Sequence, residues 1–409
     1  MKLSRIGRAS MAFVVSVAMG LGMTACGGGT VGYMWVLGTQ YNQIAGFKID
    51  NFTGNLTNTV GSPYSSGGTN PTMLVVKAGG RYVYVINKGV SAGGTTAAVQ
   101  GNIAEFAVGG DGTLTFQQIF QSQGTTPVWA TTDSSGNFLY VLDQLAPDAS
   151  GNGSITVFAI AGDTGRLQLV PNQQVKNANG TQLTYFPVGK SPTMVRLSGG
   201  SCLYTLDSAD QTIFPYSVGS GGQLTLTTNG NGGITTGAAK LTSINTGGSY
   251  VYLTDAGAVG TPGQILPYTV GTSCALNTLT GGAVQNLSLA SNPVYSLTDN
   301  RGRYLYIVNQ STTNSQNANS TISAFTIDPS SGKLQAIGDT SNPYPVGSGP
   351  VCMVEDPSSQ YVYTSNSVAG TVTGKIINQN TGQLSDLRRG STFPATGLAT
   401  CLAVSGNVN

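Results

Sequence analysis

One short pattern recurs along the chain and constrains its fold more than any other feature. The pattern is a strand of alternating aromatic and aliphatic residues that usually ends in Asn or Asp. Six copies and a degenerate first copy occur, at Tyr33–Gly38 (degenerate), Tyr82–Asn87, Phe138–Asp143, Cys202–Asp207, Tyr250–Asp255, Tyr304–Asn309 and Tyr361–Asn366. The copies lie about 55 residues apart, which predicts a repeat architecture whose units pack against their neighbours.

Each repeat carries further strands in a fixed order. A strand led by proline precedes the signature in five repeats, at Pro71, Pro127, Pro192, Pro293 and Pro350. An alternating strand such as Ile103–Val108 follows the signature, and a Gly-x-Leu turn such as Thr164–Leu167 opens the last strand. Glycine supplies the positive φ that hairpin corners need. Four short antiparallel strands, repeated seven times, predict an all-β, seven-bladed β-propeller.

The two ends of the chain indicate how the ring closes. The first repeat lacks its proline-led strand, whereas the C-terminus supplies a spare strand, Leu398–Val404. We expect this spare strand to complete blade one, because closure removes an open sheet edge.

Composition excludes several classes of protein. Only 34 of 409 residues are charged (18 Lys and Arg, 16 Asp and Glu), about a third of the usual share. A nucleic-acid reader needs a face dense in Lys and Arg, so this class is excluded. Histidine is absent, which removes Ser-His-Asp and Cys-His catalysis and histidine metal sites. We predict neither a metal nor a cofactor.

The N-terminus is typical of an exported protein. Lys2, Arg5 and Arg8 precede a short apolar run, and Thr24-Ala25 stands directly before Cys26. This pattern is that of a secretory signal, and it resembles a bacterial lipobox, which implies lipidation of Cys26. An ordinary signal peptide with an incidental cysteine is the alternative. We therefore divide the chain into a signal peptide (1–25), a glycine-rich tether (26–32) and a propeller (33–409), and expect an envelope protein held at a membrane by its lipid.

Four further cysteines have no metal-binding spacing, and export makes disulfides possible. Cys352 and Cys401 take equivalent places on inner strands of blades seven and one, so a disulfide between them would staple the ring closure. Cys202 begins a strand of blade four and Cys274 replaces the turn glycine of blade five, and these two form the second possible pair.

Signature strands end, and inner strands begin, on the same face of a propeller. The sequence therefore predicts a mouth with an apolar and aromatic ring inside a polar collar, a composition typical of small-ligand sites. The candidate ligand-binding residues are Trp129, Tyr295, Met73, Met194, Asp143, Asp207 and Asp255. The alternative is that the Asp side chains cap turns and that the ring belongs to the core.

Cations near this ring are few. Arg196, in an inner strand, is a weak catalytic candidate that could clamp a ligand carboxylate or pair with a neighbouring acid. Lys190 precedes the same inner strand, and Lys88 follows a signature strand.

The order of proline-led strand, signature, alternating strand and Gly-x-Leu turn, as in Gly347–Asn366 and Arg303–Leu334, resembles the seven-bladed, 6-phosphogluconolactonase-like lactonase family. The resemblance spans about residues 33–404. It implies Pro-Arg-His at an inner strand and Asn-Glu after a signature strand. Here the corresponding segments read, for example, Pro192-Thr193-Met194 and Asn87-Lys88. The acid, base and anion clamp of the family are thus missing.

Two functions follow from the sequence. The first is a monomeric, lipid-anchored propeller that binds a small sugar-like ligand or an envelope protein without family-type catalysis. The alternative is a lactone hydrolase acting on a sugar-acid lactone with a rebuilt active site around Arg196 and the Asp collar. A purely structural envelope protein would differ from the first only in lacking a ligand at the mouth.

Overall fold

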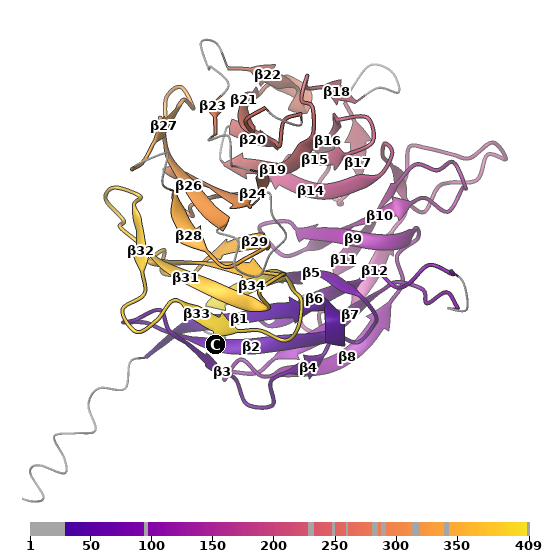
Figure 1. The fold of residues 1–409 in the computed structure, drawn as a ribbon. Coiled ribbons are helices and arrows are strands. Elements are labelled where there is room, and N and C mark those ends of the chain that lie inside the picture. The colour runs from indigo at the N-terminus through magenta and orange to yellow at the C-terminus, as the bar shows by residue number, and fades with distance from the viewer. Residues whose placement is uncertain are drawn as a thin grey trace, which may run out of the picture.

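The repeats fold into seven sheets arranged around a central channel (Figure 1). The computed structural model describes residues 29–93, 97–227, 233–247, 250–258, 261–279, 285–287, 292–311, 320–338 and 343–406. In each sheet four antiparallel strands follow one another from the channel outward. The predicted all-β, seven-bladed propeller is confirmed.

Seven inner strands line the channel. They are β34 (Ala399–Gly406), β5 (Pro71–Val76), β9 (Thr125–Thr132), β14 (Pro192–Ser198), β19 (Leu241–Gly247), β24 (Asn292–Thr298) and β29 (Pro350–Glu355). Blade five, like blade one, lacks the proline found near the start of the other five inner strands, and for this reason the sequence pattern did not identify β19. Neighbouring inner strands contact one another around the whole ring.

The second strands contain the signature. They are β1 (Thr30–Gly38), β6 (Tyr82–Asn87), β10 (Phe138–Leu145), β15 (Cys202–Asp207), β20 (Tyr250–Asp255), β25 (Tyr304–Gln310) and β30 (Tyr361–Asn366). Strand β1 begins three residues before the propeller boundary expected from the sequence.

The third strands consist of buried and partly exposed residues, and five of them contain a run of at least four buried residues instead of a strict alternation. They are β2 (Gln43–Asp50), β7 (Asn102–Val108), β11 (Ser154–Ile160), β16 (Thr212–Val218), β21 (Gln264–Val270), β26 (Ser320–Ile327) and β31 (Thr371–Ile377).

The outer strands begin at the leucine of the Gly-x-Leu turn or its equivalent. They are β3 (Leu56–Asn58), β8 (Leu114–Phe120), β12 (Leu167–Val170), β17 (Leu224–Leu226), β22 (Leu276–Thr278), β27 (Leu334–Ala336) and β32 (Leu384–Asp386).

Six sheets carry a fifth, short strand beside the third, which the sequence pattern did not reveal. These are β4 (Tyr64–Ser65), β13 (Phe186–Pro187), β18 (Ile234–Thr235), β23 (Gln285–Asn286), β28 (Tyr344–Val346) and β33 (Thr392–Pro394). Two 3-10 turns, η1 (Thr39–Tyr41) and η2 (Thr272–Cys274), are the helical elements of the described residues, and no described helix is long and apolar enough to cross a membrane.

The C-terminal strand closes the ring. β34 pairs antiparallel with β1, with Trp35 opposite Ala403, and so forms the inner strand of blade one. The two strands, indigo and yellow at the ends of the colour scale, lie side by side in Figure 1. The predicted completion of blade one from the C-terminus is confirmed.

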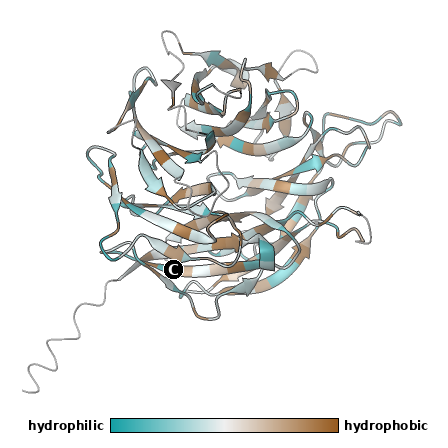
Figure 2. Cartoon of the chain, viewed as in Figure 1, coloured by the Kyte–Doolittle hydropathy of each residue, from teal (hydrophilic) through white to brown (hydrophobic). Residues whose placement is uncertain are grey.

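The core lies between the blades. The largest fully buried side chains include the aromatic residue at the third position of every signature, namely Trp35, Tyr84, Tyr140, Tyr204, Tyr252, Tyr306 and Tyr363. Figure 2 shows hydrophobic segments along the strands and hydrophilic ones in many connecting loops. Burial of one aromatic per blade explains why a single repeat is not stable alone and the ring forms as a unit.

Candidate functional site

The collar residues lie on one face of the ring but are not exposed there. The end of each signature strand pairs with the start of the inner strand, as Asp143 does with Pro127 and Asp207 with Pro192. Asp143, Asp207 and Asp255 are nevertheless fully buried. The expected exposed polar collar is therefore not found, because loops fold over the ends of these strands.

Each buried carboxylate is held by neighbouring donors. Asp143 accepts hydrogen bonds from Ser122 Oγ at 2.6 Å and Thr156 Oγ1 at 3.2 Å. Burial raises the pKa of Asp143 to about 7, and these two bonds offset the effect only in part. The Asp143 side chain thus links Ser122, in the loop before β9, to Thr156 in β11. Its role is structural.

The pKa values of Asp207 and Asp255 are shifted in opposite directions. Burial raises the pKa of Asp207 to about 7, although Thr205 Oγ1 donates a hydrogen bond of 3.0 Å to this carboxylate. Burial also acts on Asp255, but four donors outweigh it and lower the pKa of this carboxyl. Those donors include Gln264 Nε2 at 2.7 Å and the backbone N–H of Lys240 at 2.7 Å.

Of the predicted apolar ring, the two methionines belong to the core. Met73 and Met194 are 7% and 4% exposed, and Met194 Sδ accepts the backbone N–H of Ile244 at 3.5 Å. Neither methionine is exposed enough to contact a ligand.

Three residues from separate blades do come together. Arg196 (β14) places its guanidinium 5.2 Å from the ring centre of Trp129 (β9) and 5.4 Å from that of Tyr295 (β24). Its Nη2 donates a hydrogen bond of 2.6 Å to the Tyr295 hydroxyl, and the two rings lie 6.4 Å apart. The Arg–aromatic contacts hold the guanidinium in a fixed orientation.

A cavity of about 510 Å³ opens beside this cluster. Arg196, Tyr295 and the turn residues Gly199 and Gly200 line it, together with six polar residues, Thr131, Thr132, Ser134, Asn245, Thr246 and Ser296. Gly199 and Gly200 form the turn that directly follows inner strand β14. The cavity therefore lies at the opposite end of the channel from the mouth that the sequence predicted.

Arg196 has a special place in the repeat. It stands opposite Tyr204, the buried signature aromatic of its blade. The residues at this position in the other blades are neutral, namely Val75, Thr131, Asn245, Leu297, Val354 and Ala403. Sequence reasoning missed Thr131 and Asn245 as cavity residues, although alignment of the repeats places them level with Arg196.

The guanidinium has no carboxylate partner in the part of the chain that the structure describes. The two ion pairs found there are Arg303–Asp299 and Lys375–Asp386. Arg196 thus presents a positive charge and N–H donors to the cavity, and Tyr295 keeps its hydroxyl hydrogen to donate. Such an arrangement binds a carboxylate or stabilises an oxyanion.

The cysteines form two links. Disulfides join Cys202 to Cys274 and Cys352 to Cys401, the two pairs considered from the sequence. Among the described residues no group of His, Cys, Asp and Glu could hold a metal ion. Cys26, the expected lipidation site, lies outside the described residues.

Comparison with known proteins identifies the fold. A model of the family described as "Lactonase, 7-bladed beta-propeller" matches residues 30–184 and 267–400. No curated protein sequence matches the chain.

Solved structures agree with this match. A Bacteroides fragilis protein, assigned provisionally as a 6-phosphogluconolactonase, is 19% identical with a TM-score of 0.65, and the alignment covers 92% of this chain and 98% of that one. The periplasmic gluconolactonase PpgL of Pseudomonas aeruginosa is 18% identical with a TM-score of 0.67, over 92% and 99% of the two chains. At such identities the likeness establishes the fold alone.

Proposed function

Because this chain belongs to the seven-bladed β-propeller lactonase family, we propose that it hydrolyses a lactone of a sugar acid in the cavity beside Arg196. The observation that carries the proposal is the fixed guanidinium of Arg196, which faces the cavity without a carboxylate partner among the described residues. The names given to the structural neighbours, a gluconolactonase and a 6-phosphogluconolactonase, support the same class of substrate. Family membership favours this alternative over the non-catalytic binding module that was the first hypothesis from the sequence.

The cavity provides electrostatic stabilisation of the transition state. When water adds to a lactone carbonyl, the carbonyl oxygen becomes an oxyanion, and the ring oxygen then leaves as an alcohol. Nη of Arg196 and the hydroxyl of Tyr295 are placed to donate hydrogen bonds to that oxyanion. One such donor contributes about 10²–10³ to the rate in enzymes where it has been removed.

The proposed reaction uses no general base from the protein. The described residues that line the cavity contain neither a carboxylate nor an imidazole. In this proposal the attacking water loses a proton to solvent, and the ring oxygen takes a proton from solvent as it leaves as an alcohol. The Asp collar at the other end of the channel takes no part.

The test is hydrolysis of D-gluconolactone and a panel of aliphatic lactones by the chain from Gly27 onward, followed in a pH-stat after subtraction of the spontaneous rate. We expect turnover that Arg196→Ala lowers about 10²–10³-fold. The matched control is Arg81→Gln, which changes an exposed arginine on another blade. Turnover no faster than in buffer, or an Arg196→Ala variant as active as the parent, would overturn the proposal.

We propose also that the protein works in the cell envelope, anchored by a lipid on Cys26. The signal-like N-terminus supports this location, as do two disulfides, which persist in oxidising compartments. Labelling with radioactive palmitate should mark the full chain but not its Cys26→Ala variant. Equal labelling of both would contradict the anchor.

A further inference from the structure

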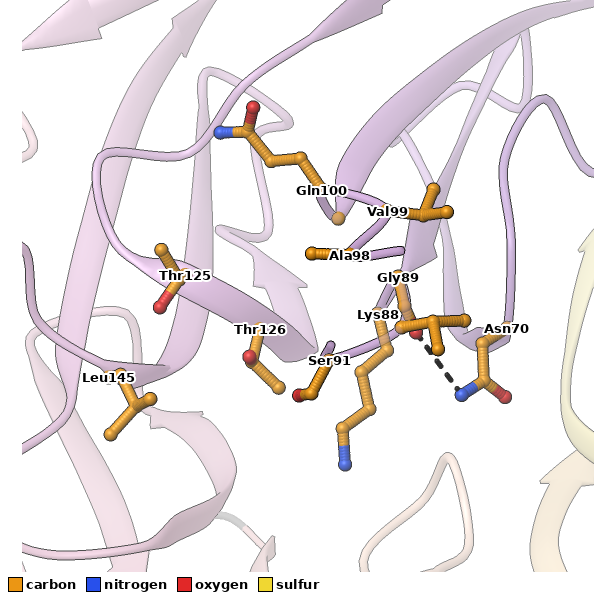
Figure 3. A pocket seen from close by; sticks show the side chains of 12 residues that line it. Asn70, Lys88, Gly89, Ser91, Ala98, Val99, Gln100, Thr125, Thr126 and Leu145 are labelled. Carbon is orange, nitrogen blue, oxygen red and sulfur yellow. Dashed lines mark hydrogen bonds between the residues drawn. The ribbon is translucent and has the colours of Figure 1, made fainter. Parts of the chain in front are cut away.

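A second cavity, of about 560 Å³, opens on the face where the inner strands begin. It lies between blades two and three. Because the Arg196 cavity lies where the inner strands end, the two cavities are at opposite ends of the ring. Figure 3 shows Lys88 and Asn70 on one side of it and Thr125, Thr126 and Leu145 on the other.

Two antiparallel segments, 88–91 and 98–101, form the wall on the side of blade two. Val90 and Val99 exchange backbone hydrogen bonds of 2.9 and 2.8 Å there. Asn70 Nδ2 donates to the carbonyl of Gly89 at 3.3 Å, and this bond is drawn in Figure 3. Gly89 has a φ of +77°, and a Cβ there would lie 2.2 Å from the carbonyl oxygen of Val99. These contacts preform the wall.

The chemistry of the cavity is that of an anion site. Lys88 is the one charged residue among the described residues that line it, and neither ion pair of the described chain includes Lys88. Ser91, Thr125, Thr126 and Gln100, which carry hydroxyl or amide groups, also line the cavity. A cation among hydroxyls and amides matches a ligand that carries one carboxylate and several hydroxyl groups.

Apolar side chains also line the cavity on both sides, Val99 on the side of blade two and Leu145 on the side of blade three. Val99 and Leu145 are 47% and 46% exposed, which places both among the few large hydrophobic side chains left on the described surface. Aliphatic side chains of this kind pack against the C–H face of a sugar ring. The combination distinguishes a sugar from a simple inorganic anion.

Thr126 adds an independent observation. Its φ is +64°, and it is the one β-branched residue with positive φ among the described residues. The same place before an inner-strand proline holds Asn70, Ser191 and Gly349, which adopt this conformation at lower cost. Backbone strain that the surrounding structure maintains is often found at binding sites.

We propose that this cavity binds a cyclic sugar that carries a carboxylate, namely a uronate. The carboxylate pairs with Lys88 Nζ, the hydroxyls of the sugar bond Ser91, Thr126 and Gln100, and the ring packs on Val99 and Leu145. The site is separate from the Arg196 cavity, so the inference does not rest on lactone hydrolysis.

The experiment is isothermal titration of the chain from Gly27 onward with sodium D-glucuronate and with D-glucose as its neutral match. We expect glucuronate to bind at least tenfold more tightly, because a charge-assisted hydrogen bond has that effect. Lys88→Met should remove this preference, whereas Lys190→Met, which alters an exposed lysine on the same face, should keep it. An oligomer of uronates, titrated in parallel, shows whether a free sugar or a chain end binds better.

Thermal melting of each variant ensures that a loss of binding is not a loss of folding. Wild-type protein that melts normally but does not distinguish glucuronate from glucose overturns the proposal. So does a Lys88→Met variant with wild-type affinity. Binding lost in Arg196→Ala but kept in Lys88→Met would place the sugar in the other cavity and would also overturn it.

Discussion

The disulfide between Cys202 and Cys274 occupies the place that an aromatic ring and a glycine fill at the other six blade junctions. At those junctions the first signature aromatic of one blade packs on the turn glycine of the next, as Tyr361 does on Gly54. A Cβ on Gly54 would lie 2.5 Å from that ring. Cys202 stands in for the aromatic and Cys274, at a φ of +61°, for the glycine. A covalent bond thus replaces a packing contact between blades four and five.

The first prediction follows from this replacement. Cys202→Ser with Cys274→Ser should lose about 2–5 kcal/mol of unfolding free energy. Cys202→Tyr with Cys274→Gly should recover much of it, since the pair restores the contact used elsewhere and relieves the positive φ. Urea unfolding under oxidising conditions measures both. A second variant no more stable than the first would contradict the equivalence.

The second prediction concerns hydrogen bonds between blades. The hydroxyl of Tyr363 donates to the carbonyl of Gly54 at 2.7 Å and so links blade seven to blade one. Tyr363→Phe leaves that buried carbonyl without its donor and should cost about 1–3 kcal/mol. Tyr140, at the same position in blade three, has a buried hydroxyl with no partner in the described chain. Tyr140→Phe is the matched control and should be neutral or stabilising; equal losses in the two variants would argue against the prediction.

The third prediction is a dependence of stability on pH. The pKa of Asp143 is about 7 in the folded chain and near 3.8 when unfolded, so the folded state binds more protons between these values. Stability should therefore fall as pH rises from about 4 to 7, by up to about 1.4 kcal/mol per pH unit for this group. Above pH 7 its contribution is constant.

Asp143→Asn should reduce that slope, and Asn is compatible with the site because Asn87, Asn309 and Asn366 occupy the equivalent positions. Unfolding free energies at several pH values measure the effect. The exposed Asp163→Asn serves as control and should keep the wild-type slope. A slope unchanged in Asp143→Asn would exclude this carboxyl as its source.

The fourth prediction addresses the chemistry at Arg196. A lysine keeps the charge but not the planar group that stacks on Trp129 and Tyr295, so Arg196→Lys should retain more activity than Arg196→Ala and less than the parent. With no carboxylate or imidazole among the described lining residues, kcat/KM should rise steadily with pH. A bell-shaped profile with a break near pH 7 would instead indicate a general base.

Much of the fold could be predicted because its signals are local. Alternation in Tyr82–Asn87 and the turn at Gly165 depend on neighbouring residues alone. The strand recurs seven times and the turn glycine six times, which leaves few architectures. The site was harder to predict. Trp129 and Tyr295 are 166 positions apart, and no sequence pattern shows that both rings flank Arg196.

The sequence by itself determined the seven blades, the closure through β34 and the identity of the few residues capable of binding chemistry. Only the tertiary structure decided which of them meet and which face water. Alternation specifies the side of a strand on which a residue lies, but not its depth in a channel built from seven distant segments. Packing of those segments buried Asp143 and Asp207 under loops and left Arg196 facing a cavity at the opposite end.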